Sequence, residues 1–158
     1  EEGIRLRKEG ISLPLIVLNP EVNGFEELIS FDLEPEVYNF RILEAFIKES
    51  ERRGIMDYPI HLKIDTGMHR LGFLPEQIPE MITLLKRQKG LKVRSVFSHL
   101  SASESWHFDD FTHRQMEISG RSRSRLNRGS VILSISIFSI RRVWNDLRIL
   151  NGIWRVWE

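Results

Sequence analysis

The sequence predicts an α/β protein that forms part of a (β/α)8 barrel, with about four consecutive βα units. The first observation is alternation, because short apolar runs typical of strands take turns with helical patterns at spacings that suit a parallel sheet. The second is the predicted strand over residues 60–66, which has one apolar and one polar face. In an open parallel sheet helices cover both faces, whereas a barrel strand turns one face inward. The polar face therefore favours an incomplete barrel over an open sheet.

Each predicted element has a local signal. Asn39 precedes a helical pattern and is expected to cap it. Pro79 suits the first turn of a later helix, and Gly90 suits its end. The predicted elements, in order, are a helix over residues 1–9, a buried strand in 14–20, a weaker strand in 31–39, a helix over 40–53, a strand over 60–66, a helix over 76–89, a strand over 93–100 and a helix that starts at about residue 109.

Composition restricts the kind of protein and of site. Charged residues make up 28% of the chain and the net charge is +1, so no overall basic field indicates a nucleic-acid partner. The chain has no cysteine, which excludes disulfides and thiolate metal sites. No apolar run reaches the roughly 18–20 residues that span a bilayer, so we expect no membrane association and a cytoplasmic location. Because residue 1 is Glu, we expect the sequence to begin inside a longer chain.

The candidate site lies on the polar face of residues 60–66. Alternation assigns Lys63 and Asp65 to that face, together with His61. Thr66 and Gly67 then turn the chain, so that Met68 and Arg70 are expected on a loop at the carboxyl end of the strand, which is where barrel enzymes have their sites.

Two other interpretations of this segment stay open. Asp-Thr-Gly is often an ordinary turn, in which Asp65 would accept hydrogen bonds from backbone amides and Gly67 would adopt a positive φ. The same triplet occurs in aspartic proteases, where two carboxylates share a proton. That interpretation fits poorly, because those enzymes follow the triplet with a small residue and have an all-β fold.

Residues 61–73, HLKIDTGMHRLGF, resemble the alanine racemase motif of a lysine, a DTGM turn and an arginine seven residues after the lysine. The segments EEGIRLR, LPLIVLN, DLEPEVYN, FSHLSASES and FTHRQ are similar to further racemase segments, in family order, so the resemblance covers residues 1 to about 118. It implies the N-terminal barrel domain of a fold-type-III enzyme that binds pyridoxal 5'-phosphate. It further implies a cytoplasmic homodimer that interconverts L- and D-alanine and so supplies D-alanine for peptidoglycan.

The resemblance also implies roles for particular residues. Arg70 would contact the phenolic oxygen of the cofactor and the substrate carboxylate, a task that suits a permanently charged guanidinium. His99 matches the histidine beside the cofactor ring. Lys63 matches a lysine that the family carries as a carbamate, which would attract Arg70 where an ammonium would repel it. Asp65 and Met68 are possible supporting residues. The alternative for Lys63 is an ordinary ion pair with Asp65.

The resemblance places neither catalytic base of the family within this chain. By resemblance, the lysine that anchors the cofactor belongs upstream of Glu1, and the catalytic tyrosine belongs to a later β-domain. Tyr38 and Tyr58 match neither role. We therefore expect the chain alone to be inactive and to fold poorly, because an incomplete barrel leaves strand edges unpaired. A non-catalytic barrel that binds pyridoxal phosphate and a defunct gene product remain alternatives.

Residues 119–158 differ from residues 1–118 in composition. The first segment has 15 basic and 20 acidic residues, whereas the second has 8 arginines, no lysine and 2 acids. We predict a domain boundary at residue 118, followed by an atypical, poorly ordered tail that a frameshift near Ile118 would explain. Back-translation of residues 134–158, shifted by two nucleotides, permits HIHILNSAGMERF, which is close to the expected racemase continuation. The alternative to a frameshifted tail is that residues 119–158 form a basic segment that lies on a membrane surface.

Overall fold

The computed structural model describes residues 1–101, 106–129 and 134–135. Five parallel strands form one sheet in the order β1-β2-β3-β4-β5. The strands are β1 (Ile16–Val17), β2 (Glu34–Val37), β3 (Tyr58–Lys63), β4 (Leu91–Phe97) and β5 (Ser134–Ile135). The helices are α1 (Glu2–Lys8), η1 (Val22–Gly24), α2 (Phe25–Ser30), α3 (Phe40–Arg53), η2 (Pro75–Gln77), α4 (Ile78–Arg87), η3 (Trp106–Phe108) and α5 (Asp109–Arg128).

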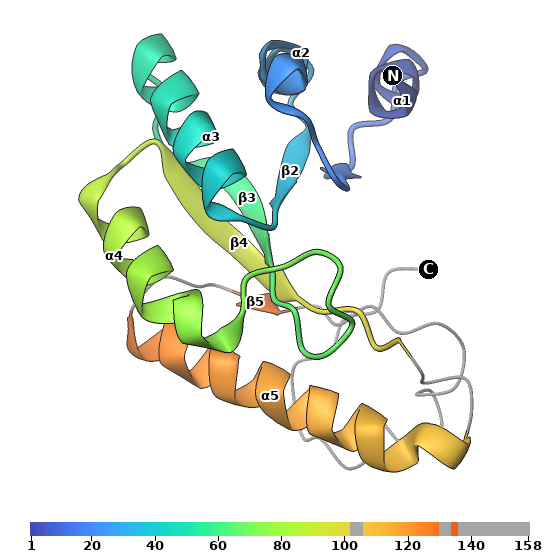
Figure 1. The fold of residues 1–158 in the computed structure, drawn as a ribbon. Helices are drawn as coiled ribbons and strands as arrows, with labels where there is room; N and C mark the ends of the chain where they lie inside the picture. The colour runs from blue at the N-terminus through green and yellow to red at the C-terminus, as the bar shows by residue number, and fades with distance from the viewer. Residues whose placement is uncertain (102–105, 130–133, 136–158) are drawn as a thin grey trace.

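Strands and helices alternate along the chain, and each strand pairs with its neighbour in sequence (Figure 1). In Figure 1 the helices α3, α4 and α5 follow one another around the outside of the strands. This arrangement is that of consecutive βα units in a (β/α)8 barrel, and it confirms the predicted partial barrel.

The core lies between the sheet and the helices. Ile60 and Leu62 of β3 are fully buried on the face that alternation assigned as apolar. Phe46 of α3 is also fully buried, with its ring edge-on to Phe25 of α2 at a centroid distance of 4.8 Å and tilted against Tyr58 at 5.5 Å. Burial of a side chain of this size contributes about 1.5–3 kcal/mol, so this aromatic cluster holds α2 and α3 against β3.

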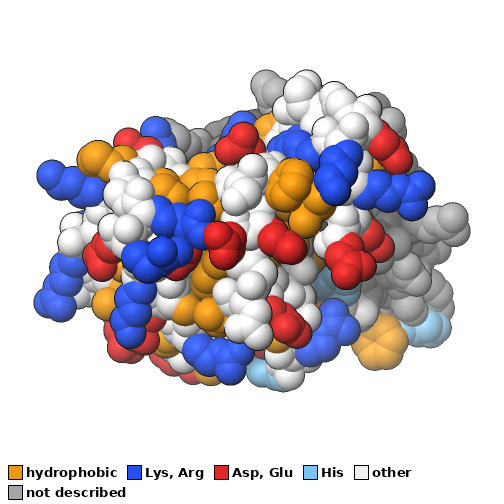
Figure 2. Space-filling view, turned by 90° about the horizontal axis from the view of Figure 1, so that it is seen from above, with side chains coloured by type: hydrophobic (Ala, Val, Ile, Leu, Met, Phe, Trp, Pro, Cys, Tyr) orange, Lys and Arg blue, Asp and Glu red, His pale blue; other side chains and the backbone are white. Residues whose placement is uncertain are grey.

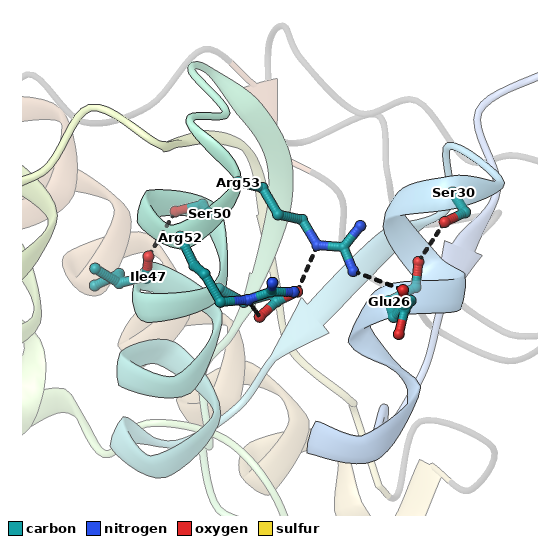
Figure 3. Close-up of polar contacts among 7 residues, drawn as sticks. Glu26, Ser30, Ile47, Ser50, Arg52 and Arg53 are labelled. Atoms are coloured by element: carbon teal, nitrogen blue, oxygen red, sulfur yellow. Dashed lines mark hydrogen bonds and ion pairs between the residues drawn. The ribbon is translucent and has the colours of Figure 1, made fainter.

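Helix α3 begins and ends where the sequence predicts. The Asn39 side chain accepts a hydrogen bond from the backbone N–H of Ile42 at 2.9 Å, which satisfies one of the free amides of the first turn. Arg53 in the last turn contacts Glu49 of the same helix and lies 3.2 Å from Glu26 of α2 (Figure 3). The pair with Glu26 links α3 to α2 at the surface, where ion pairs add little stability.

Three local features differ from the prediction. The six-residue α2 and the turn η1 before it were not predicted, because so short a helix does not repeat its apolar pattern. Helix α4 ends at Arg87, and its C-cap is Gln88 rather than Gly90. Gly90 instead allows close packing, since a Cβ added there would lie 2.2 Å from the Ser50 hydroxyl.

Helix α5 crosses the predicted boundary at residue 118 without a break. Residues 119–128 are helical and bury Ser119, Ser122 and Leu126, while the predicted domain boundary and tail stay a prediction. The short strand β5 pairs in parallel with β4. The rest of the predicted tail, residues 130–133 and 136–158, lies outside the described residues.

The described surface combines both charge signs. Figure 2 shows basic and acidic side chains next to one another, with apolar side chains between them, on the face seen from above. Within the part of the chain that the structure describes, no helix is both long enough and apolar enough to cross a membrane.

Candidate functional site

The inner face of the sheet is polar because strand register brings like-facing residues together. His61 of β3 pairs with Glu36 of β2 and with Ser95 of β4. Nε2 of His61 lies 2.6 Å from a carboxylate oxygen of Glu34, and its Nδ1 lies 2.6 Å from the Ser95 hydroxyl. A carboxylate only accepts, so Nε2 carries a proton in this arrangement. All three side chains are buried, and each therefore has the partner that burial requires.

Glu34 stays a carboxylate in this buried position. Burial is the largest single influence and acts to raise the pKa of Glu34. The hydrogen bond and charge of His61, together with the guanidinium of Arg94, outweigh it and lower the pKa of Glu34 below its ordinary value. These contacts join β2, β3 and β4 below the candidate site and fix the positions of the strands.

One layer nearer the carboxyl ends of the strands, Lys63 meets Glu36. Nζ of Lys63 lies 2.8 Å from Oε1 of Glu36, in an ion pair whose geometry is not that of an aligned hydrogen bond. Oε2 of Glu36 accepts the backbone N–H of Asn19 at 2.6 Å, which ties in the end of β1. The Lys63 ammonium also lies 5.7 Å from the centre of the Phe97 ring. The ion pair of Lys63 with Asp65, considered from the sequence, is thus replaced by a pair with Glu36.

Asp65 has the role of an ordinary turn residue. Its Oδ1 accepts the backbone N–H groups of Gly67 at 2.9 Å and His69 at 3.1 Å, and Gly67 has a φ of 139°. Phe73 then returns to the strand, since its N–H donates to the Lys63 carbonyl at 2.8 Å and its carbonyl accepts from the Asp65 N–H at 3.0 Å. The loop between them is therefore closed at its base by backbone hydrogen bonds.

This loop carries Arg70 at the carboxyl end of β3. Arg70 is exposed and makes no hydrogen bond or ion pair with any residue that the structure describes, while Met68 is half-buried on the same loop. Partial burial lowers the pKa of His99 first, and the positive charges of Lys63 and Arg70 lower it further. Lys63 ends β3, Arg70 lies on the loop that follows it, and His99 follows β4, whose end pairs with that of β3. We call these three residues the basic cluster.

One residue that supports the site, Gln115 of α5, was not identified from the sequence. Gln115 of α5 is fully buried; it donates to the Thr66 hydroxyl at 3.3 Å and to the His99 carbonyl at 3.2 Å. Its side-chain oxygen accepts the N–H of Ser101 at 3.2 Å, and Thr66 also lies 2.7 Å from the Ser98 hydroxyl. The signal in the sequence is a polar residue on the face of α5 that packs inward, a position where an apolar residue is usual.

Tyr58 contributes to the packing of the described residues. Tyr58 is buried and its hydroxyl donates to the carbonyls of Leu28 and Leu33, at 3.1 and 2.9 Å, so that it has a structural role. In residues 1–101, 106–129 and 134–135 no three His, Asp or Glu side chains are placed to bind a metal ion together. The basic cluster is suited instead to an anionic ligand, such as a carboxylate or a phenolate.

Comparison with curated proteins identifies the family of the chain. The family described as "Alanine racemase, N-terminal domain" matches residues 1–139. The alanine racemase of Sorangium cellulosum is 36% identical over 133 residues, which cover 79% of this chain and 34% of that protein. The alanine racemase of Thermodesulfovibrio yellowstonii is 36% identical over 128 residues, covering 80% and 33%. The chain thus spans about a third of the length of these relatives.

Solved structures of alanine racemases are also similar to this chain. Alanine racemase of Clostridium difficile 630 superposes with a TM-score of 0.77 at 25% identity, over 86% of this chain and 36% of the other. The same racemase in complex with cycloserine gives a TM-score of 0.74 at 27% identity, covering 85% and 38%. A third structure, alanine racemase from Bartonella henselae with covalently bound pyridoxal phosphate, gives 0.69 at 17%, covering 86% and 38%, and shows the fold alone. From the fold, the site and these matches, the chain belongs to the alanine racemase family and corresponds to a part of its N-terminal barrel domain.

Proposed function

We propose that this chain forms the wall of an alanine racemase site that faces pyridoxal 5'-phosphate and alanine. The observation that supports this most directly is the basic cluster at the carboxyl ends of β3 and β4, the end at which (β/α)8 enzymes bind their ligands. The family match supports an isomerase acting on an amino acid. When bound, the cofactor withdraws electrons from the α-carbon and so makes its proton removable. The residues of this chain would bind the cofactor and the substrate and orient them.

Arg70 is proposed to bind the anionic groups. Its guanidinium is exposed, with no ion-pair partner among the described residues, so its donors are available to a ligand. A planar guanidinium binds a carboxylate through two parallel hydrogen bonds, which fixes the orientation of the substrate as well as its position. Asp65 acts through the turn that it holds, and Met68 is half-buried on the same loop.

His99 is proposed to lie beside the cofactor ring as a neutral imidazole. Its lowered pKa, caused by partial burial and by two nearby cations, favours the uncharged form at neutral pH. An uncharged, flat ring packs against another flat ring without adding a third full charge to the site. Gln115 holds the His99 carbonyl and so helps to fix the direction of the side chain.

The groups that move the α-proton are proposed to come from parts of the enzyme that this chain does not include. Tyr58 is committed to two backbone carbonyls, and the relatives are about three times as long as the matched region. We therefore expect the 158-residue chain to be inactive alone. A homodimeric, cytoplasmic enzyme is proposed by the same resemblance.

A chimera tests this function. The chain would replace the matching segment of the Sorangium cellulosum racemase, and growth without D-alanine would be measured in a bacterium that lacks alanine racemase. We expect growth from the chimera and none from the chain alone. Arg70→Ala in the chimera should abolish growth, whereas Arg41→Ala, at an exposed position on α3, should not.

Spectroscopy separates the alternatives. A folded chimera that shows the cofactor's absorbance without turnover would support a non-catalytic binding protein. A folded chimera that neither absorbs nor racemises would contradict the proposal. Racemase activity from the purified 158-residue chain would contradict the expectation that catalytic groups lie elsewhere.

A further inference from the structure

The loop that carries Arg70 contains a residue whose backbone conformation is uncommon for its type. His69 has a φ of 54°, in the left-handed region. We infer that His69 is a positioning residue for Arg70, and that its left-handed backbone, rather than its imidazole, sets the direction in which the loop presents the guanidinium. The inference rests on the proposed function only in taking Arg70 as the residue that binds an anionic ligand.

His69 differs from the other described residues that have a side chain and a positive φ. These others are Asn19, Asp32 and Asp57. Asn and Asp tolerate the left-handed region because their short polar side chains form hydrogen bonds with the nearby backbone. For other residues the conformation costs free energy, persists only where the surrounding structure determines it, and is found most often at binding and active sites. The loop must therefore hold His69 in place through other contacts.

Contacts on both sides of His69 hold this conformation. Its N–H donates to Oδ1 of Asp65 at 3.1 Å, and the same oxygen accepts the N–H of Gly67 at 2.9 Å. Helix α5 packs on the turn at Gly67, where an added Cβ would lie 3.2 Å from Cζ of Phe111. Further along the loop, a Cβ added at Gly72 would lie 2.5 Å from the Asp65 nitrogen. The loop is therefore fixed both before and after His69.

The φ of His69 determines the direction of Arg70. Rotation about the N–Cα bond of a residue turns the whole chain that follows it. A change of His69 to the right-handed region would have to be absorbed before Phe73, where backbone hydrogen bonds close the loop. Only residues 70–72 are available for this, and Gly72 is packed tightly against backbone. Arg70 itself would therefore take up much of the change and point elsewhere.

The imidazole of His69 has no comparable role. The side chain is exposed, and it makes no hydrogen bond or ion pair with any residue that the structure describes. A side chain that tolerates the left-handed region should therefore serve at this position, and one that does not should displace Arg70. Asn meets the first condition, and the β-branched Val meets the second.

Residual dipolar couplings of the ¹⁵N-labelled full chain test this inference, because the couplings of the Arg70 and Leu71 amides report the direction of the loop. A substitution that only lowers stability leaves these couplings of the folded state unchanged. The matched pair is His69→Asn and His69→Val, since both variants lack the imidazole. The control is Asp57→Val, because Asp57 is exposed and has a φ of 56° but lies before the amino end of β3. We expect the same couplings in the wild type, His69→Asn and Asp57→Val, and a change or loss of them in His69→Val.

Each other outcome contradicts the inference. Changed couplings in His69→Asn show that the imidazole is needed, and unchanged couplings in folded His69→Val show that the backbone of residue 69 does not direct Arg70. An equal change in Asp57→Val shows a general loss of structure rather than an effect of the loop. If His69→Val does not fold, His69→Ala takes its place, since alanine also lacks the imidazole and is disfavoured at a positive φ. These couplings require neither a ligand nor racemase activity, so they can fail independently of the proposed function.

Discussion

Gly72 is the position where a single methyl group should disturb the candidate site most. It closes the loop that presents Arg70, and its φ is 131°, in a region that residues with a side chain rarely adopt. A Cβ added there would lie 2.5 Å from the backbone nitrogen of Asp65 and 2.8 Å from the carbonyl carbon of Ile64. Both contacts are to backbone atoms of the residues that follow β3, so no side-chain rotation can relieve them.

The cost of Gly72→Ala follows from these two effects. A strained backbone conformation costs about 1–3 kcal/mol. Overpacking against atoms that cannot rotate away costs about 1–3 kcal/mol as well. Together they predict a loss of about 2–6 kcal/mol in the free energy of unfolding, against the roughly 5–15 kcal/mol that a domain usually has. The hydrogen bonds between Phe73 and the strand should weaken first, because the clash lies beside them.

Gly120→Ala is the matched control. Gly120 lies exposed within α5, and a Cβ added there meets nothing within 4 Å. Alanine in a helix interior is favoured over glycine by about 0.5–1 kcal/mol, so this variant should be more stable than the wild type. Urea unfolding followed by far-ultraviolet circular dichroism measures both changes. If Gly72→Ala unfolds within about 0.5 kcal/mol of the wild type, the uncertainty usual for a neutral substitution, the steric reasoning is refuted.

Three further predictions follow from the same structure. Phe46→Ala should lower the free energy of unfolding, measured in urea, by about 3–5 kcal/mol because the Phe46 ring is fully buried. Phe108 is 55% exposed, so Phe108→Ala should change that free energy by less than about 0.5 kcal/mol. Equal effects of the two variants would contradict the assigned core. Gln115→Leu should leave the His99 carbonyl and the Ser101 N–H without their partner and lower stability by about 1–3 kcal/mol, and it should shift the NMR signals of the His99 ring; unchanged signals would show that Gln115 does not position His99. The lowered pKa of Glu34 contributes stability that is present above its unfolded pKa, near 4.5, and is lost as pH falls through the lower folded value. Acid unfolding should therefore become less steep in Glu34→Gln, and an unchanged acid limb would contradict this role.

Much of the fold could be predicted from local signals. The start of α3 follows from Asn39, whose side chain caps the first turn, and this is a property of a short segment. The two faces of β3 follow from the alternation of side chains along an extended chain. The same alternation placed Lys63 on the polar side and, with the following turn, placed Arg70 at the carboxyl end of the strand. These predictions were confirmed because each depends on covalent geometry within a few residues.

What the sequence by itself determined was therefore the family, the βα alternation and the candidate residues of the site. Only the tertiary structure decided which groups touch. The partner of Lys63 is Glu36 rather than Asp65, because the register of β2 against β3 sets which carboxylate lies at 2.8 Å. The bracing of the site by Gln115 likewise depends on how α5 packs across the ends of two strands. Contacts of this kind depend on the relative positions of elements far apart in the chain, and no local pattern specifies those positions.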